Sequence, residues 1–179
     1  KNKSNGIEKE REKQLEIQAK LDAIDKSQGT IEFNMDGTVI TANDNFLGVM
    51  GYSLQEAKGQ HHRAFCEDSY AKSNEYEMFW EKLNRGEFDS GEYKRIGKGG
   101  KEIWIQATYN PILDLNGKVF KVIKFATDIT EKKEMEVKIK SVMEKVAEKA
   151  QTLAGASEEL TATSEQMTTA IEAALAVDG

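Results

Sequence analysis

Two adjacent histidines, His61 and His62, are the side chains best suited to bind a cofactor, and they are the only histidines in the chain. A neutral imidazole can ligate iron or hydrogen-bond to an organic ring. Arg63 follows them and could meet a phosphate or a propionate, or else form a surface ion pair. Because most histidines in folded domains are structural, a packed and hydrogen-bonded role for each is the alternative.

Aromatic residues at two places could form the walls of a pocket. Tyr76, Phe79 and Trp80 recur at helical spacing, which fits a core stripe first and a cofactor wall second. In the segment 103–107, strand alternation puts Trp104 and Gln106 on one face and the three small or aliphatic residues on the other. A Trp beside a Gln predicts a pocket wall that carries polar groups.

The remaining chemistry-bearing residues argue against an enzyme. Cys66 is the only cysteine, so the chain has no internal disulfide and no C-x-x-C site, and a lone Cys is most often a buried small hydrophobe. We find no nucleophile with its base, no glycine-rich phosphate loop and no clustered set of metal ligands in the sequence. We therefore expect a binding or sensory module and no metal site, unless His61 or His62 binds haem iron.

Composition further narrows the class of protein to which the chain can belong. The formal net charge of −6 disfavours nucleic-acid binding, which needs a basic face to release counterions. No apolar run approaches the roughly 18–20 residues that cross a bilayer, and no signal peptide is present, so a cytoplasmic location is expected. The chain begins with Lys1 and is expected to be a fragment whose parent could carry an anchor.

The elements expected to position these side chains change type along the chain. Residues 29–43 predict two strands that turn at Asp36-Gly37 and end at Asn43, which can cap the next helix. Short helices are expected over 43–50, 54–58 and 75–83, with Ser53 as a further N-cap. Strands follow over 91–96, 102–111 and 119–127. This order predicts an α+β fold, a five-stranded antiparallel sheet with short helices on one face that enclose a pocket.

Helical segments flank this core. Residues 1–28 carry one narrow apolar stripe at Ile17, Leu21 and Ile24, which needs a partner surface. Residues 131–179 carry two series with a spacing of seven: Ile139, Val146, Leu153, Leu160, Met167 and Ala174, and Met135, Val142, Lys149, Ala156, Thr163 and Ala170. A heptad seam of about six repeats predicts a coiled coil, although packing on its own domain is the alternative. We predict a parallel homodimer through both helical extensions.

Residues 29–130 resemble a PAS sensor domain. They end in Phe125-Ala-Thr-Asp-Ile-Thr-Glu131, where a strand closing in Asp-Ile-Thr feeds a long charged helix, as in PAS domains that precede an output coiled coil. Asp128 and Glu131 have the spacing of a capping box. We therefore expect Asp128, Thr130 and Glu131 to form the junction that carries a signal from sheet to helix. The expected organisation is a helix over 1–28, a PAS domain over 29–130 and a signalling helix over 131–179.

Within this segment the chain is similar to aerotaxis transducers. The matching residues are Ala42-Asn-Asp-Asn-Phe-Leu47, Gly51-Tyr-Ser53, Gly59-Gln-His-His62, Met78-Phe-Trp80, Trp104 and Pro111. The resemblance implies FAD in the pocket, contacted by Asn43, His61, His62, Trp80, Trp104 and Gln106. The chain departs at Cys66-Glu-Asp68, where those transducers carry Arg-His-Pro. A haem b bound through His61 or His62, and an empty pocket, are the alternatives.

Residues 156–167 resemble the start of the cytoplasmic signalling helices of methyl-accepting chemotaxis proteins. With Ile139 at position a, two pairs fall at f and g one heptad apart, Glu158-Glu159 and Glu165-Gln166. The resemblance makes them candidates for carboxyl methylation, the alternative being ordinary solvated acids. It also implies a methyltransferase, and a chemotaxis histidine kinase and coupling protein that act through a downstream region.

The leading interpretation is therefore a sensory module of an energy-taxis receptor. A cofactor or ligand in the PAS pocket would alter the sheet, and the change would pass through the Asp-Ile-Thr junction into the coiled coil. Two other functions remain open: a cofactor-free PAS dimerisation module, and control of a different kinase or a cyclase.

Overall fold

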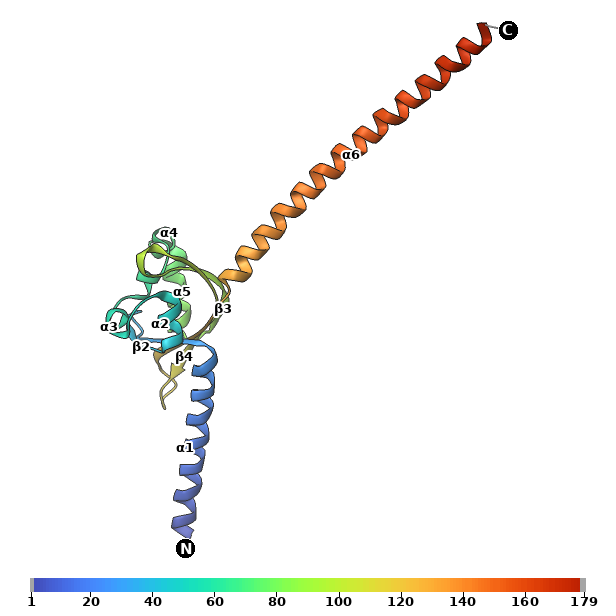
Figure 1. The fold of residues 1–179 in the computed structure, drawn as a ribbon. Helices are drawn as coiled ribbons and strands as arrows, with labels where there is room; N and C mark the ends of the chain where they lie inside the picture. The colour runs from blue at the N-terminus through green and yellow to red at the C-terminus, as the bar shows by residue number, and fades with distance from the viewer. Residues whose placement is uncertain (1, 178–179) are drawn as a thin grey trace. The chain divides into compact units, whose positions relative to one another are not determined.

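The structure is a computed structural model that describes residues 2–177 (Figure 1). Its centre is a five-stranded antiparallel sheet with the strand order β2-β1-β5-β4-β3. The strands are β1 (Gly29–Phe33), β2 (Val39–Ala42), β3 (Asp89–Ile96), β4 (Glu102–Leu113) and β5 (Val119–Asp128). Strands β4 and β5 pair along most of their length, from Ile105 opposite Asp128 to Leu113 opposite Val119.

Short helices connect β2 to β3. They are α2 (Asp44–Met50), α3 (Leu54–Ala57), η1 (His62–Phe65), α4 (Asp68–Ala71) and α5 (Asn74–Asn84), and a single 3₁₀ turn, η2 (Lys98–Gly100), joins β3 to β4. The predicted fold class is confirmed, and the predicted strands and longer helices lie within two residues of their observed bounds. The sequence prediction missed η1, α4 and η2, which have four residues or fewer.

Local chemistry explains why the helices begin where they do. Asn43 caps α2 by accepting a hydrogen bond from the Phe46 amide, and Ser53 forms a full capping box with Glu56 at the start of α3. These caps satisfy amides that have no partner within the helix. The turn after β1 contains Gly37 at φ +87°, a conformation that glycine adopts without strain.

The hydrophobic core lies between the sheet and the short helices. Along β4 the inward residues are Ile103, Ile105, Ala107 and Tyr109, all nearly inaccessible, and they alternate with more exposed neighbours. Strand alternation therefore gives β4 one apolar face that packs toward α5 and an opposite face that points away from the core.

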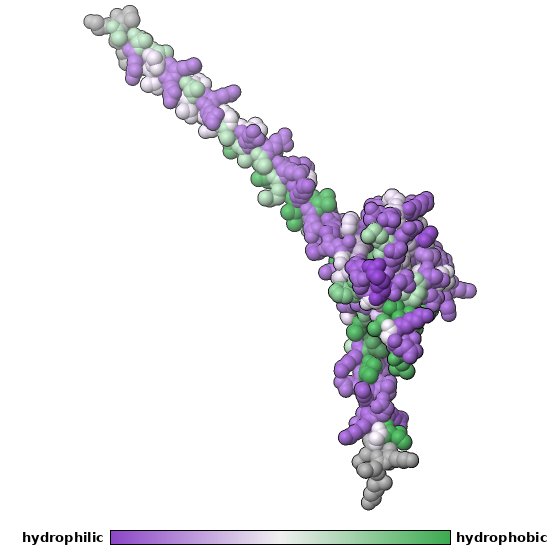
Figure 2. Space-filling model, turned by 180° about the vertical axis from the view of Figure 1, so that it is seen from behind, coloured by the Kyte–Doolittle hydropathy of each residue, from purple (hydrophilic) through white to green (hydrophobic). Residues whose placement is uncertain are grey.

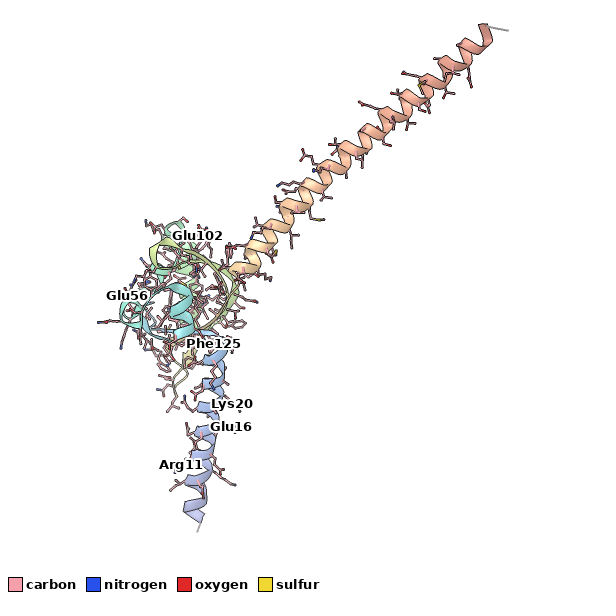
Figure 3. All side chains as sticks on the ribbon, in the orientation of Figure 1. Arg11, Glu16, Lys20, Glu56, Glu102 and Phe125 are labelled. Atoms are coloured by element: carbon pink, nitrogen blue, oxygen red, sulfur yellow. The ribbon has the colours of Figure 1, made fainter. Side chains whose placement is uncertain are left out.

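Long helices precede and follow the sheet, α1 (Asn2–Ser27) and α6 (Thr130–Val177). Side chains project from α1 along its length, Arg11, Glu16 and Lys20 among them (Figure 3), and Lys20 pairs with Glu16 at 2.6 Å. The chain divides into two compact units, residues 1–131 and 132–179. No helix of the described part, 2–177, is long and apolar enough to span a bilayer.

The heptad series of α6 is exposed. Leu153 and Leu160 are each 72% accessible, and hydrophobic residues alternate with hydrophilic ones along the helix in Figure 2. An exposed apolar series of this length is typical of a surface that binds a partner.

Candidate functional site

His62 lies at the centre of the core, where the loop after α3 turns inward. Its amide donates to the Gly37 carbonyl at 2.8 Å, which fixes the start of η1 against the first turn of the sheet. The imidazole is 1% exposed, and both of its nitrogens are hydrogen-bonded at 3.1 Å, Nδ1 to the Tyr76 hydroxyl and Nε2 to the Tyr109 hydroxyl. The ring therefore joins helix α5 to strand β4.

Aromatic rings surround this imidazole. Phe79 stacks on it with centroids 5.8 Å apart, and Phe33 and Trp80 approach edge-on at 5.3 and 5.7 Å. Edge-to-face and stacked pairs of this kind stabilise a packed interior. The predicted stripe of Tyr76, Phe79 and Trp80 is thus core, and it packs around His62.

The imidazole of His62 is neutral. Burial holds the pKa of His62 well below its ordinary value, and the positive charges of Arg95 and Lys124 act in the same direction. Burial raises the pKa of the Tyr76 hydroxyl to about 12 and also raises that of Tyr109. Each tyrosine therefore keeps its proton, and the imidazole can donate to one and accept from the other.

Two further charged residues reach the same interior, Arg95 from β3 and Lys124 from β5. Arg95 donates from Nη2 to the Tyr109 hydroxyl at 3.0 Å, and the Lys124 ammonium lies 4.9 Å from the centre of the Tyr109 ring. Sequence reasoning missed both. The signal was available, because alternation from Val122 to Ala126 places Lys124 on the inward face.

Cys66 and His61 border this cluster. The Cys66 sulfur lies 3.8 Å from His62 Nδ1, and burial raises the pKa of its thiol, which makes it a poor nucleophile. His61 is half-buried, and its Nδ1 accepts a hydrogen bond from the Arg63 amide at 3.2 Å. A Cβ at Gly37 would come within 2.9 Å of the His61 Nε2, so the glycine is needed for this close approach.

Asn43 does not point toward His62, which corrects the prediction that both contact one ligand. Its Oδ1 accepts from the amides of Thr30 and Phe46, and its Nδ2 donates to the carbonyls of Asp25 and Gln28. The side chain therefore ties the end of α1 to the start of α2, and its hydrogen-bonding groups are used there.

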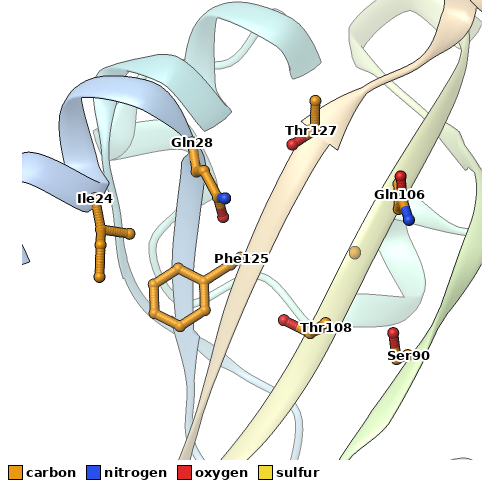
Figure 4. Close-up of a pocket in the computed structure, with 8 residues that line it drawn as sticks. Ile24, Gln28, Ser90, Gln106, Thr108, Phe125 and Thr127 are labelled. Atoms are coloured by element: carbon orange, nitrogen blue, oxygen red, sulfur yellow. The ribbon is translucent and has the colours of Figure 1, made fainter.

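Trp104 and Gln106 lie on the outer face of the sheet, which corrects their prediction as walls of the interior. The alternation was right, but the aliphatic residues on the other face of β4 are the ones that pack inward. Gln106 lines a shallow surface pocket of about 470 Å³ together with Ile24 and Gln28 (Figure 4). Of the six residues predicted to contact FAD, the structure brings together only His61, His62 and Trp80.

The geometry of these residues does not fit the predicted cofactors. Rings fill the space around His62, and Asn43, Trp104 and Gln106 face elsewhere. Haem ligation through His62 would break one of its two hydrogen bonds to tyrosine. We therefore assign no step to FAD or haem.

At the C-terminal end of β5, the junction to α6 is hydrogen-bonded to β4. The Ile129 amide donates to the Trp104 carbonyl at 2.8 Å, and the Thr130 hydroxyl accepts from the Trp104 amide at 3.0 Å. Asp128 in turn accepts from the amide and the hydroxyl of Thr130. The expected capping box with Glu131 is wrong, because α6 begins at Thr130 and Glu131 is one position too early for that role.

Comparison with known proteins assigns this fold. The sequence profile of the PAS fold family matches residues 39–126. The chain contains a PAS domain. A crystal structure of the PAS domain of a protein from Colwellia psychrerythraea superposes with a TM-score of 0.56 at 22% identity, covering 64% of this chain and 98% of that one. A structure of an RNA-binding light-oxygen-voltage receptor has the same TM-score at 18% identity, covering 65% of this chain and 34% of that one.

Two curated relatives contain a segment similar to this PAS region. The biofilm dispersion protein BdlA of Pseudomonas aeruginosa is 45% identical over 117 residues, which is 65% of this chain and 28% of that protein. The aerotaxis receptor of Escherichia coli is 32% identical over 98 residues, which is 55% of this chain and 19% of the receptor. The chain thus spans less than a third of either relative. These matches confirm the PAS prediction made from the Asp-Ile-Thr junction.

Proposed function

We propose that this chain is the sensory input region of a chemotaxis-type receptor. A change in the PAS core passes through the hydrogen-bonded junction at Ile129 and Thr130 into helix α6, and α6 controls a histidine kinase through a coupling protein. The similarity to an aerotaxis receptor and to a biofilm dispersion protein supports a sensory role for the PAS domain.

The observation that carries the proposal is the pair of hydrogen bonds that the main chain of Trp104 makes with Ile129 and Thr130. Strand β4 presents Ile103 and Ile105 to the core, and the main chain of Trp104 between them holds Ile129 and Thr130. A shift of β4 in response to the core is therefore transmitted directly to the first residue of α6. The coupling needs no contact between α6 and the rest of the PAS domain.

Helix α6 has the properties that an output helix of this kind needs. Its apolar heptad series is exposed, so we propose that it pairs with α6 of a second copy. Four residues of the predicted modification pairs lie exposed on the same helix: Glu158, Glu159, Glu165 and Gln166. We propose them as substrates of a carboxyl methyltransferase.

Thr130→Val is expected to disturb the output without unfolding the domain. Loss of the hydroxyl removes its bonds to Trp104 and Asp128, worth about 1 kcal/mol, which shifts a two-state output about fivefold. The measurement is kinase phosphorylation with the coupling protein, using residues 1–176 fused in heptad register to a chemoreceptor kinase-control domain. Thr127→Val is the control, because Thr127 is exposed and lies on β5, three residues before Thr130. Equal kinase activity in both variants would refute the coupling route.

The chain purified without added cofactor is expected to be colourless. The physical reason is that the rings around His62 fill the space where a flavin or a haem would lie. An absorption spectrum of the freshly purified chain from 300 to 700 nm, roughly the range that covers both chromophores, is the measurement. Flavin bands, or a haem band that disappears in His62→Ala, would instead establish the cofactor and reject this part of the proposal.

A further inference from the structure

A continuous series of hydrogen bonds crosses the core of the PAS domain. The Tyr109 hydroxyl is bonded to Arg95 Nη2 at 3.0 Å and to His62 Nε2 at 3.1 Å. The Tyr76 hydroxyl is bonded to His62 Nδ1 at 3.1 Å and lies 3.4 Å from His61 Nδ1. His61 is half-buried, whereas the other four residues are at most 2% exposed. The series therefore connects a buried guanidinium to an imidazole at the edge of the core.

The guanidinium fixes the position of the proton on His62. Arg95 can only donate, so the single proton of the Tyr109 hydroxyl goes to its other partner, His62 Nε2. The neutral His62 ring then carries its own proton on Nδ1 and donates it to the Tyr76 hydroxyl. The Cys66 thiol donates to the His62 carbonyl at 3.6 Å and does not compete for this nitrogen.

At the outer end of the series, His61 Nδ1 is an acceptor. The Arg63 amide donates to it at 3.2 Å, and this bond caps η1. The Tyr76 hydroxyl, which accepts from His62, has its own proton free to donate to the same nitrogen. Neutral His61 therefore carries its proton on Nε2, so the two adjacent histidines are held in opposite tautomers.

Charged and titratable groups face the His61 ring from three elements: Asp36 in the turn between β1 and β2, Arg63 and His62 on η1, and Tyr76 on α5. Burial and the charge of Arg63 lower the pKa of His61, whereas a hydrogen bond to the Asp36 backbone and the Asp36 carboxylate raise it. The ring is thus neutral at neutral pH and gains a proton on acidification.

We propose that His61 Nδ1 is a proton-binding site through which the sensory core responds to acidification. This inference rests on the proposed function, since it names the stimulus that acts on the same core. The ligand is the proton itself, and it enters at the one imidazole of the series that is not fully buried.

A proton on His61 Nδ1 would face two donors. The Arg63 amide cannot accept, so η1 is expected to lose its cap. The Tyr76 hydroxyl can accept from His61 only by leaving its own proton without an acceptor, because His62 Nδ1 already carries one, and a buried unpaired donor is costly. We therefore expect Tyr76 to shift away from His62, which changes the link between α5 and β4, the strand whose Trp104 main chain holds the start of α6.

Proton–nitrogen correlation spectra of the chain with labelled histidine test the site, because His61 and His62 are the only histidines. At about pH 8, above the ordinary range of histidine, we expect the proton on Nε2 of His61 and on Nδ1 of His62. As the pH is lowered to about 5, His61 should become doubly protonated while His62 stays neutral, and the Thr130 amide resonance should shift together with His61. The same tautomer in both rings, or a Thr130 amide that does not follow His61, would overturn the proposal.

Two exposed neighbours provide a matched pair of charge variants. Arg63→Gln removes a positive charge and keeps the backbone amide, so the pKa of His61 should rise. Asp36→Asn removes a negative charge and keeps the Oδ1 that accepts from Thr38, so the pKa of His61 should fall. His61→Asn removes the titrating group, while its Oδ1 can still cap η1. A Thr130 response that keeps its midpoint in both charge variants, or that persists in His61→Asn, would refute the site.

Kinase phosphorylation with the fused chain provides the functional readout. The ratio of the activity of the unaltered chain to that of His61→Asn is expected to change at least about threefold across the titration of His61, the effect of losing about one hydrogen bond. A constant ratio, in a fusion whose activity does respond to Thr130→Val, would reject the proton site and keep the proposed function. Coupled titration of His61 and Thr130, in a fusion whose activity responds to neither variant, would reject the proposed function and keep the site.

Discussion

Replacing Lys124 with methionine is expected to stabilise the protein, by up to about 1–4 kcal/mol, the range for replacing buried ion pairs with apolar residues of similar size. Lys124 is 1% exposed and contacts the rings of Phe46 and Tyr109, so an unbranched apolar side chain fits the same space. Urea unfolding at pH 7 measures the change. Lys118→Met makes the same replacement at an exposed turn and is expected to change stability little.

The depressed pKa of Lys124 also predicts how the free energy of unfolding changes with pH. The pKa of Lys124 is depressed in the folded state, so the unfolded chain binds more protons and the free energy of unfolding rises with pH up to about 10.5, at up to about 1.4 kcal/mol per unit. Over the pH range between the depressed folded pKa of Lys124 and about 10.5, this rise should be present in the unaltered chain and smaller in Lys124→Met. Identical slopes, or a less stable variant, would mean that Lys124 is paired with an anion.

The fold could be predicted largely from local rules. The Asp36-Gly37 turn, the Ser53 N-cap and the alternation in β4 each follow from a few neighbouring residues, and each is present in the structure. The junction was predicted less well, because shifting the start of α6 to Thr130 moved Glu131 out of the capping position. Helix ends depend on tertiary bonds such as that from Ile129 to Trp104, which sequence spacing does not reveal.

The site was harder to predict because it depends on which face of each strand is buried. Trp104 is the larger residue, yet Ile103 and Ile105 are the buried ones, at 0% and 2% exposed, because the sheet turns their face inward. Arg95 and Lys124 were missed for the opposite reason, since charged residues are expected outside. His62 was selected as a possible cofactor contact because of its residue type and the family resemblance, and the structure places it in the core.

The apolar series of α6 leads to the other large expected effect. In a dimer of the chain, Leu153 would face Leu153 of the second copy at an a position. Leu153→Asp removes two buried side chains, worth about 1.5–3 kcal/mol each, and places two carboxylates together. We therefore expect the dimer dissociation constant to rise at least about a hundredfold.

Sedimentation equilibrium of the chain at micromolar concentration is the measurement, and Gln151→Asp is its control. Gln151 lies at position f, where the same negative charge would face solvent and leave the dimer intact. A chain that is monomeric with residues 131–179 present would reject the coiled coil. Val146→Cys tests the orientation, because a parallel, in-register pair places residue 146 opposite itself, whereas an antiparallel pair that overlaps along all of α6 does not. The native Cys66 is buried and does not compete for the cross-link. Both copies of the PAS domain would then feed the same end of one coiled coil, which is the arrangement that a signal entering at Thr130 requires.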